Sequence, residues 1–152
     1  MLEYHKMTEE EKYCIARWKY PGEYAIYNSL SYEEQKKRGF GFANPENHLY
    51  SFYDGKELVG FINLNGEDPG VFFGIGVNPD CCGKGYGQQM TRTAWEISQM
   101  LFPGKPMYLE VRTWNQRAIR CYEKAGFRIV GEPIQQTTSI GEGAFYHMVR
   151  RG

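Results

Sequence analysis

Residues 74–87 read GIGVNPDCCGKGYG, and this stretch decides the fold because it joins an apolar strand to a helix through a glycine-rich turn. The glycines at positions 83, 85 and 87 let backbone N–H groups approach a ligand without interference from Cβ atoms. The helix that begins after them adds unpaired N–H groups and a dipole, which together favour an anion. The stretch therefore predicts a phosphate or pyrophosphate site.

Two common phosphate motifs do not fit this turn. A P-loop would need glycine and then Ser or Thr at the positions where Asn78 and Gly85 stand. A dinucleotide fingerprint that starts at Gly83 would need a third glycine at the position of Gln88. The remaining alternative is a turn without a ligand. It is disfavoured because each glycine at a helix start is less stable than alanine by ~1 kcal/mol without an evident folding gain.

Outward from the turn, the sequence predicts strands that alternate with helices. Apolar residues recur every three or four positions over 86–101, which predicts a helix with one buried face. Asp54-Gly55-Lys56 lies between two β-rich runs and predicts a hairpin over 49–64. Further helices are expected at 8–18, after Ser31 and after Asn115, and further strands at 71–77, 107–111, 127–130 and 144–149. These elements predict an α/β (α+β) layered sheet of mixed direction.

Length, charge and cysteine content limit the class of protein. The 152 residues are expected to form a single domain, 1–152, and the 18 basic residues balance the 18 acidic residues. No basic tract indicates nucleic-acid binding, and no window approaches the ~18 apolar residues that a membrane helix needs. The four cysteines and three histidines lack zinc-ligand spacing. We expect a cytoplasmic protein with reduced thiols, no metal and neither nucleic acid nor membrane as a partner.

Two motifs resemble those of one enzyme family. Residues 82–87, CGKGYG, are similar to the acetyl-CoA motif of the GCN5-related N-acetyltransferase (GNAT) family. Residues 109–115, LEVRTWN, together with Tyr122, Gly126 and Phe127, resemble its second motif, in the form found in ribosomal-protein N-terminal acetyltransferases. The resemblance implies a GNAT-like mixed central sheet of about six to seven strands flanked by helices, with acetyl-CoA as cosubstrate.

The resemblance also implies which residues bind the donor. The backbone of residues 75–77 would pair with the pantetheine arm, and amides of the turn would hold the pyrophosphate. Cys82 stands where the family usually has Arg or Gln, so the backbone must carry more of the phosphate binding. Asn115 is a helix cap and also a candidate cofactor contact. The full donor set is Ile75, Gly76, Val77, Cys82, Gly83, Lys84, Gly85, Tyr86, Gly87, Gln88 and Asn115.

Amine acetylation requires two proton transfers, and two residues are candidates for them. An alkylammonium with pKa near ~10.4 must lose a proton before it attacks, so a carboxylate base is useful. The resemblance favours Glu110, whose pKa would have to rise by about two units through burial. The alternative is a carboxylate that faces solvent or pairs with Arg112. Tyr122 is the candidate acid for the departing thiolate, and its alternative is a core aromatic.

The acceptor is expected to approach the aromatic segment 18–32. Aromatic faces suit cationic amines, and Glu23, Glu33 and Glu34 are near in sequence. The alternative is that these aromatics form core and the surface of a homodimer. Residues 1–70 carry a formal charge of −4 and residues 71–131 carry +4, which suits a cationic acceptor and an anionic donor. We expect direct acetyl transfer to a small-molecule or peptide amine; a non-catalytic acyl-CoA-binding or protein-interaction module is the alternative.

Overall fold

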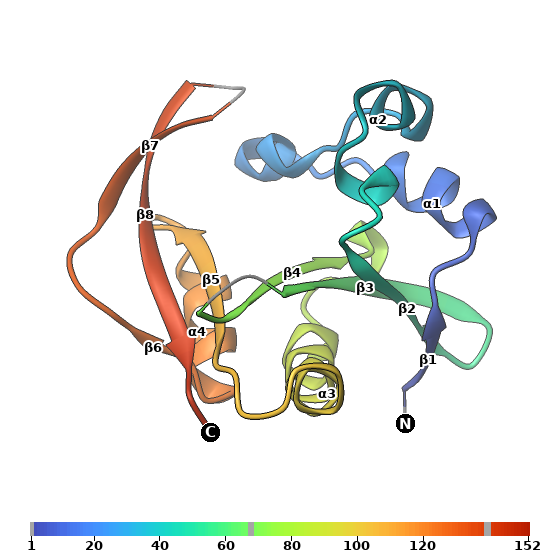
Figure 1. The fold of residues 1–152 in the computed structure, drawn as a ribbon. Helices are drawn as coiled ribbons and strands as arrows, with labels where there is room; N and C mark the ends of the chain where they lie inside the picture. Colours follow the sequence, from blue (N-terminus) through green and yellow to red (C-terminus); the bar gives the residue numbers. More distant parts are fainter. Residues whose placement is uncertain (1, 67–68, 139–140) are drawn as a thin grey trace.

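The structure, a computed structural model, describes residues 2–66, 69–138 and 141–152 (Figure 1). In this part of the chain, eight strands form one sheet in the order β1-β2-β3-β4-β5-β8-β6, and β7 pairs with β8. The strands are β1 (Glu3–Lys6), β2 (His48–Asp54), β3 (Glu57–Gly66), β4 (Val71–Val77), β5 (Met107–Arg112), β6 (Arg128–Ile129), β7 (Ile134–Thr138) and β8 (Gly141–Arg150). The helices are α1 (Glu9–Ala16), α2 (Tyr32–Arg38), α3 (Tyr86–Leu101) and α4 (Gln116–Lys124), with 3₁₀ turns η1 (Gly22–Tyr27), η2 (Gly41–Ala43) and η3 (Pro79–Cys81).

The predicted mixed α/β fold is confirmed, with two strands more than the sequence patterns indicated. β1 pairs antiparallel with β2 at one edge of the sheet, and β7 pairs with β8 at the other side. All four residues of β1 are exposed, and β7 reads IQQTT. Neither strand therefore shows the apolar-polar alternation that marks a half-buried strand.

Helices cover both faces of the sheet. Met90, Ala94 and Ile97 of α3 are buried in a core that includes Ile62 and Leu64 of β3. A second, smaller core lies under α1 and α2, on the opposite side of β2 and β3, and Figure 1 shows these helices above the sheet. The alternation of β3 side chains between the two cores explains why this strand is apolar along most of its length.

The helix ends follow the predicted caps. The Thr8 hydroxyl accepts from the Glu11 N–H, and the Glu11 carboxylate accepts from the Thr8 N–H, which completes a capping box. Ser31 caps α2, and Asn115 caps α4 through the Ala118 N–H. Gly126 follows α4 with a φ of +99°, as expected for a left-handed residue after a helix.

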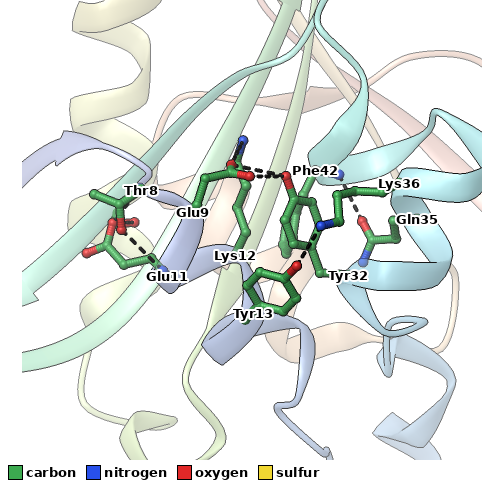
Figure 2. A network of polar contacts seen from close by, with 10 residues as sticks. Thr8, Glu9, Glu11, Lys12, Tyr13, Tyr32, Gln35, Lys36 and Phe42 are labelled. Carbon is green, nitrogen blue, oxygen red and sulfur yellow. Dashed lines mark hydrogen bonds and ion pairs between the residues drawn. The ribbon is translucent and has the colours of Figure 1, made fainter.

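A polar and aromatic network joins α1 to α2. The Lys36 ammonium lies 5.0 Å from the ring centroids of both Tyr13 and Tyr32, and its nitrogen donates to the Tyr13 hydroxyl at 2.6 Å. The Tyr32 hydroxyl donates to the Glu9 carboxylate at 2.9 Å, as Figure 2 shows. These contacts fix the two short helices that precede and follow the aromatic segment.

Candidate active site

The sheet opens between β4 and β5. Within the described residues, these parallel strands pair at Val71–Met107 and Phe72–Tyr108 alone, after which they diverge (Figure 1). A cavity of about 580 Å³ lies at this opening and is lined by β4, β5, the glycine-rich turn, α4 and the aromatic segment. A cavity of this size between separated parallel strands is a natural ligand site.

The edge of β4 presents backbone groups to the opening. The Val71 N–H donates to the Pro106 carbonyl at 2.8 Å, on the side of β5. Because backbone direction alternates along a strand, Ile75 and Val77 direct their groups to the same side. Gly76 instead faces β3, where it pairs with Phe61, and the Phe61 ring fills the place that a Cβ of Gly76 would take. Of the three residues predicted to pair with the pantetheine arm, Ile75 and Val77 therefore direct their backbone groups to the opening, and Gly76 does not.

The glycine-rich turn is built for backbone binding of an anion. Gly83 and Gly85 have φ values of +81° and +83°, which residues with a side chain rarely adopt. Gly85 is the N-cap of the 16-residue helix α3 and supplies no side-chain bond to it. The N–H groups of Tyr86, Gly87 and Gln88, in the first turn, therefore have no partner within the helix. All three residues line the cavity.

Side chains of the turn are engaged elsewhere. The Cys82 Sγ lies 3.7 Å from the Asn78 carbonyl oxygen, so this side chain folds back onto the turn. The Tyr86 hydroxyl donates to the Asp54 carboxylate at 2.6 Å, and this bond raises the pKa of Tyr86 to about 12. Lys84 is exposed and does not line the cavity, whereas the other ten residues of the expected donor set do. The turn thus offers backbone amides more than side-chain charge.

Tyr122 packs in the core and also lines the cavity. Its ring contacts Phe73 and Phe127 edge-on, with centroids 6.4 and 6.1 Å away, so it is part of the core. It also lines the cavity, and no residue of the described chain hydrogen-bonds its hydroxyl. Burial raises the pKa of Tyr122, so the hydroxyl stays protonated well above neutral pH. A free donor therefore lies in the cavity.

Glu110 lies in a different environment from the one expected. It is exposed, on the face of β5 opposite the buried residues Leu109 and Val111. Its Oε2 accepts from the Nε2 of Gln136 on β7, at 2.5 Å. The burial that a strongly basic carboxylate needs is absent, although Glu110 does line the cavity. Gln136 was not anticipated, because β7 reaches β5 only through β8.

The aromatic segment forms the other wall. Tyr24 and Tyr27 of η1 lie 5.6 and 6.4 Å from the Trp114 ring, measured between centroids. The Tyr27 hydroxyl accepts from the Asn115 Nδ2 at 3.0 Å, while the Asn115 Oδ1 caps α4. The Arg117 guanidinium lies 4.6 Å from the Tyr24 ring centroid. The segment therefore packs on the loop between β5 and α4.

The charge of the cavity is opposite to the one expected for its acceptor side. Glu33 and Glu34 do not line it; they lie on α2, where they pair with Lys36 and Arg38, each at 3.2 Å. Among the described lining residues, Glu110 is the only carboxylate. The lining cations are Arg112, Arg117, Arg120 and Lys124.

Two negative findings concern the described residues alone. Within residues 2–66, 69–138 and 141–152, no three His, Cys, Asp or Glu side chains are grouped so that they could hold a metal ion. No helix in that same part of the chain has the length and apolarity to cross a bilayer.

Known proteins share sequence with this chain. Residues 10–127 match the model of the acetyltransferase (GNAT) family. The N-alpha-acetyltransferase RimI of Mycobacterium tuberculosis is 34% identical over 94 residues, which span 59% of this chain and only 57% of that relative.

Two solved structures have a similar fold. The spermidine N-acetyltransferase of Vibrio cholerae, in complex with CoA and spermine, has a TM-score of 0.75 at 19% identity, over 97% of this chain and 94% of that one. The ribosomal-protein-S18-alanine N-acetyltransferase of Escherichia coli has a TM-score of 0.72 at 18% identity, over 99% and 93%.

Proposed function

This chain belongs to the GNAT acetyltransferase family, and from that premise we propose that it transfers an acetyl group from acetyl-CoA directly to a primary amine. The observation that carries the proposal is the opening between β4 and β5. The first residues of α3, whose N–H groups have no partner within the helix, line this cavity together with Tyr122, whose hydroxyl is a free donor.

Donor binding would use mostly backbone groups. Ile75 and Val77 would pair with the amides of the pantetheine arm, and the N–H groups at the start of α3 would bind the pyrophosphate. Arg120 and Lys124 line the same cavity and add positive charge for the phosphates. Cys82, which folds back onto Asn78, would contribute its N–H rather than its side chain.

In the transfer step the amine lone pair forms a bond to the thioester carbonyl carbon, and the C–S bond then breaks. The sulfur leaves with the electron pair, and the Tyr122 O–H is the group that stabilises it. Burial holds the pKa of Tyr122 above that of an ordinary thiol, near ~8.5, so hydrogen-bond donation is favoured over complete proton transfer. Glu110 would accept the proton that the amine releases, directly or through water.

The acceptor that fits best is a singly charged amine of low basicity. A chain α-amine has a pKa of about 8, so neutralising it at pH 7 requires only ~1 kcal/mol, against ~4–5 kcal/mol for an alkylamine. This difference matters because Glu110 is exposed. A polyamine would also meet one lining carboxylate and several cations. We therefore favour a peptide N-terminus or another α-amine over a polyamine.

A thiol-release assay with acetyl-CoA tests the proposal. The acceptors are short peptides with free N-termini, the same peptides with blocked N-termini, spermidine and a simple alkylamine. We expect release with the free peptides, little with spermidine and none with the blocked peptides. Preference for spermidine would contradict the acceptor class. Binding of CoA without transfer to any amine would contradict catalysis and leave the acyl-CoA-binding module.

A further inference from the structure

The Tyr20 side chain lies at the open end of β4. Its hydroxyl donates to the Val77 carbonyl oxygen at 2.8 Å, across 57 positions of sequence. Both residues line the cavity, and burial raises the pKa of Tyr20, which keeps the hydroxyl a donor at neutral pH. The Val77 carbonyl oxygen, on the free edge of β4, thus already accepts a hydrogen bond from Tyr20, in the segment after α1.

The position of this bond matters for any chain that pairs with β4. Val77 is the last residue of the strand, and its backbone groups face the opening. A carbonyl oxygen accepts best from donors near the plane of its peptide, and a β-ladder uses that same direction. The Tyr20 hydroxyl, which already bonds this oxygen, would therefore compete there with the N–H of an added, strand-like ligand.

We propose that Tyr20 blocks the donor edge of β4 and that the pantetheine arm of CoA displaces it from the Val77 carbonyl. The inference rests on the proposed function because it requires CoA as the ligand. It does not require acetyl transfer. Binding of the donor then breaks one protein hydrogen bond and replaces it with one to the ligand.

Displacement of Tyr20 would reach the acceptor wall. The Tyr20 N–H donates to the Asn28 Oδ1 at 2.7 Å, so the two ends of the η1 loop are tied together. Between them, Tyr24 packs on Trp114, and the Tyr27 hydroxyl accepts from Asn115. Movement at Tyr20 therefore alters the surface that an amine meets.

Calorimetric titration of the whole protein with CoA tests the inference. Tyr20→Phe keeps the ring and removes the hydroxyl, so the ligand no longer competes for Val77. One net hydrogen bond corresponds to an affinity about three- to tenfold higher for this variant than for wild type. Tyr32→Phe is the matched control. In wild type the Tyr32 hydroxyl donates to the Glu9 carboxylate at 2.9 Å, and Tyr32 lies on α2, a helix that does not line the cavity. Its CoA affinity should equal that of wild type.

Amide hydrogen exchange gives a second readout over residues 18–28. In wild type, CoA should speed exchange in this segment, and Tyr20→Phe should exchange fast even without CoA. Equal or weaker CoA affinity in Tyr20→Phe, or slower exchange of the wild-type segment on CoA binding, would overturn the inference. Absence of CoA binding to both proteins would overturn the proposed function as well, so the two failures are distinct.

Discussion

Replacement of Glu11 by Gln should remove a large part of the stability of the fold at neutral pH. Glu11 is 8% exposed and joins α1 to the sheet. Burial of the carboxylate opposes its ionisation, but donors from Tyr53, Thr8, Ser51 and His5 outweigh burial and lower the pKa of Glu11 to about 2. The charged form is therefore the one that the folded protein stabilises.

The size of the effect follows from the lowered pKa of Glu11. A fall in pKa from 4.5 to about 2 corresponds to roughly 3 kcal/mol of unfolding free energy, at ~1.4 kcal/mol per pH unit. Because the folded pKa is the lower one, this stabilisation is complete above pH 4.5 and is lost as the pH falls toward 2. A domain of this size has ~5–15 kcal/mol in total, so the loss is substantial.

Thermal and urea unfolding at pH 7 and at lower pH measure the effect. Glu11→Gln should lower the melting temperature by ~6–12 °C at pH 7, and the difference from wild type should shrink as the pH approaches 2. Glu10→Gln is the matched control, because Glu10 is an exposed carboxylate in the same helical turn, and it should change little. A pH-independent difference, or an equal loss in the control, would refute the role of the charged network.

Four predictions concern the site. Tyr122→Phe should lower turnover by ~10²-fold or more while the melting-temperature shift caused by CoA stays unchanged, and unaltered turnover would remove Tyr122 from the chemistry. Because burial raises the pKa of Tyr122, wild-type turnover should show no loss from this group up to pH 10, which a pH-rate profile checks. Glu110→Gln should slow acetylation of an alkylamine at least tenfold more than that of a peptide α-amine, and equal losses would argue against a base at this position. Gly85→Ala should weaken CoA binding at least tenfold in a titration, whereas Gly55→Ala, also at positive φ but in the β2–β3 hairpin, should reduce stability by a similar ~1–2 kcal/mol and leave CoA affinity intact.

The elements that the sequence predicted well are those with strong periodicity or clear caps. The helix over 86–101 and the strand over 71–77 have the same bounds in the structure as in the prediction, since their buried faces and bounding residues are local signals. β1 and β7 were not predicted, because edge strands rich in polar residues carry no such pattern. Their pairing is decided by the rest of the sheet.

The backbone geometry of the glycine-rich turn was predictable from sequence, whereas the surroundings of Glu110 and Val77 were not. Backbone binding at a glycine-rich helix start depends on neighbouring residues, and the glycines at 83 and 85 have the positive φ that this requires. The surroundings of Glu110 depend on Gln136, and the use of the Val77 carbonyl depends on Tyr20. Such contacts join segments far apart in sequence, so no local pattern indicates them.

The short pairing of β4 with β5 also divides the backbone hydrogen bonds of the sheet into two blocks. β1–β4 form one antiparallel block, β5–β8 form another, and in the described residues two residue pairs join their ladders. Phe73 of β4 and Leu109 of β5 are buried in the same core, so side-chain packing more than backbone pairing holds the two blocks together. A ligand that pairs with the open edge of β4 would add backbone hydrogen bonds at the boundary where the protein itself has few.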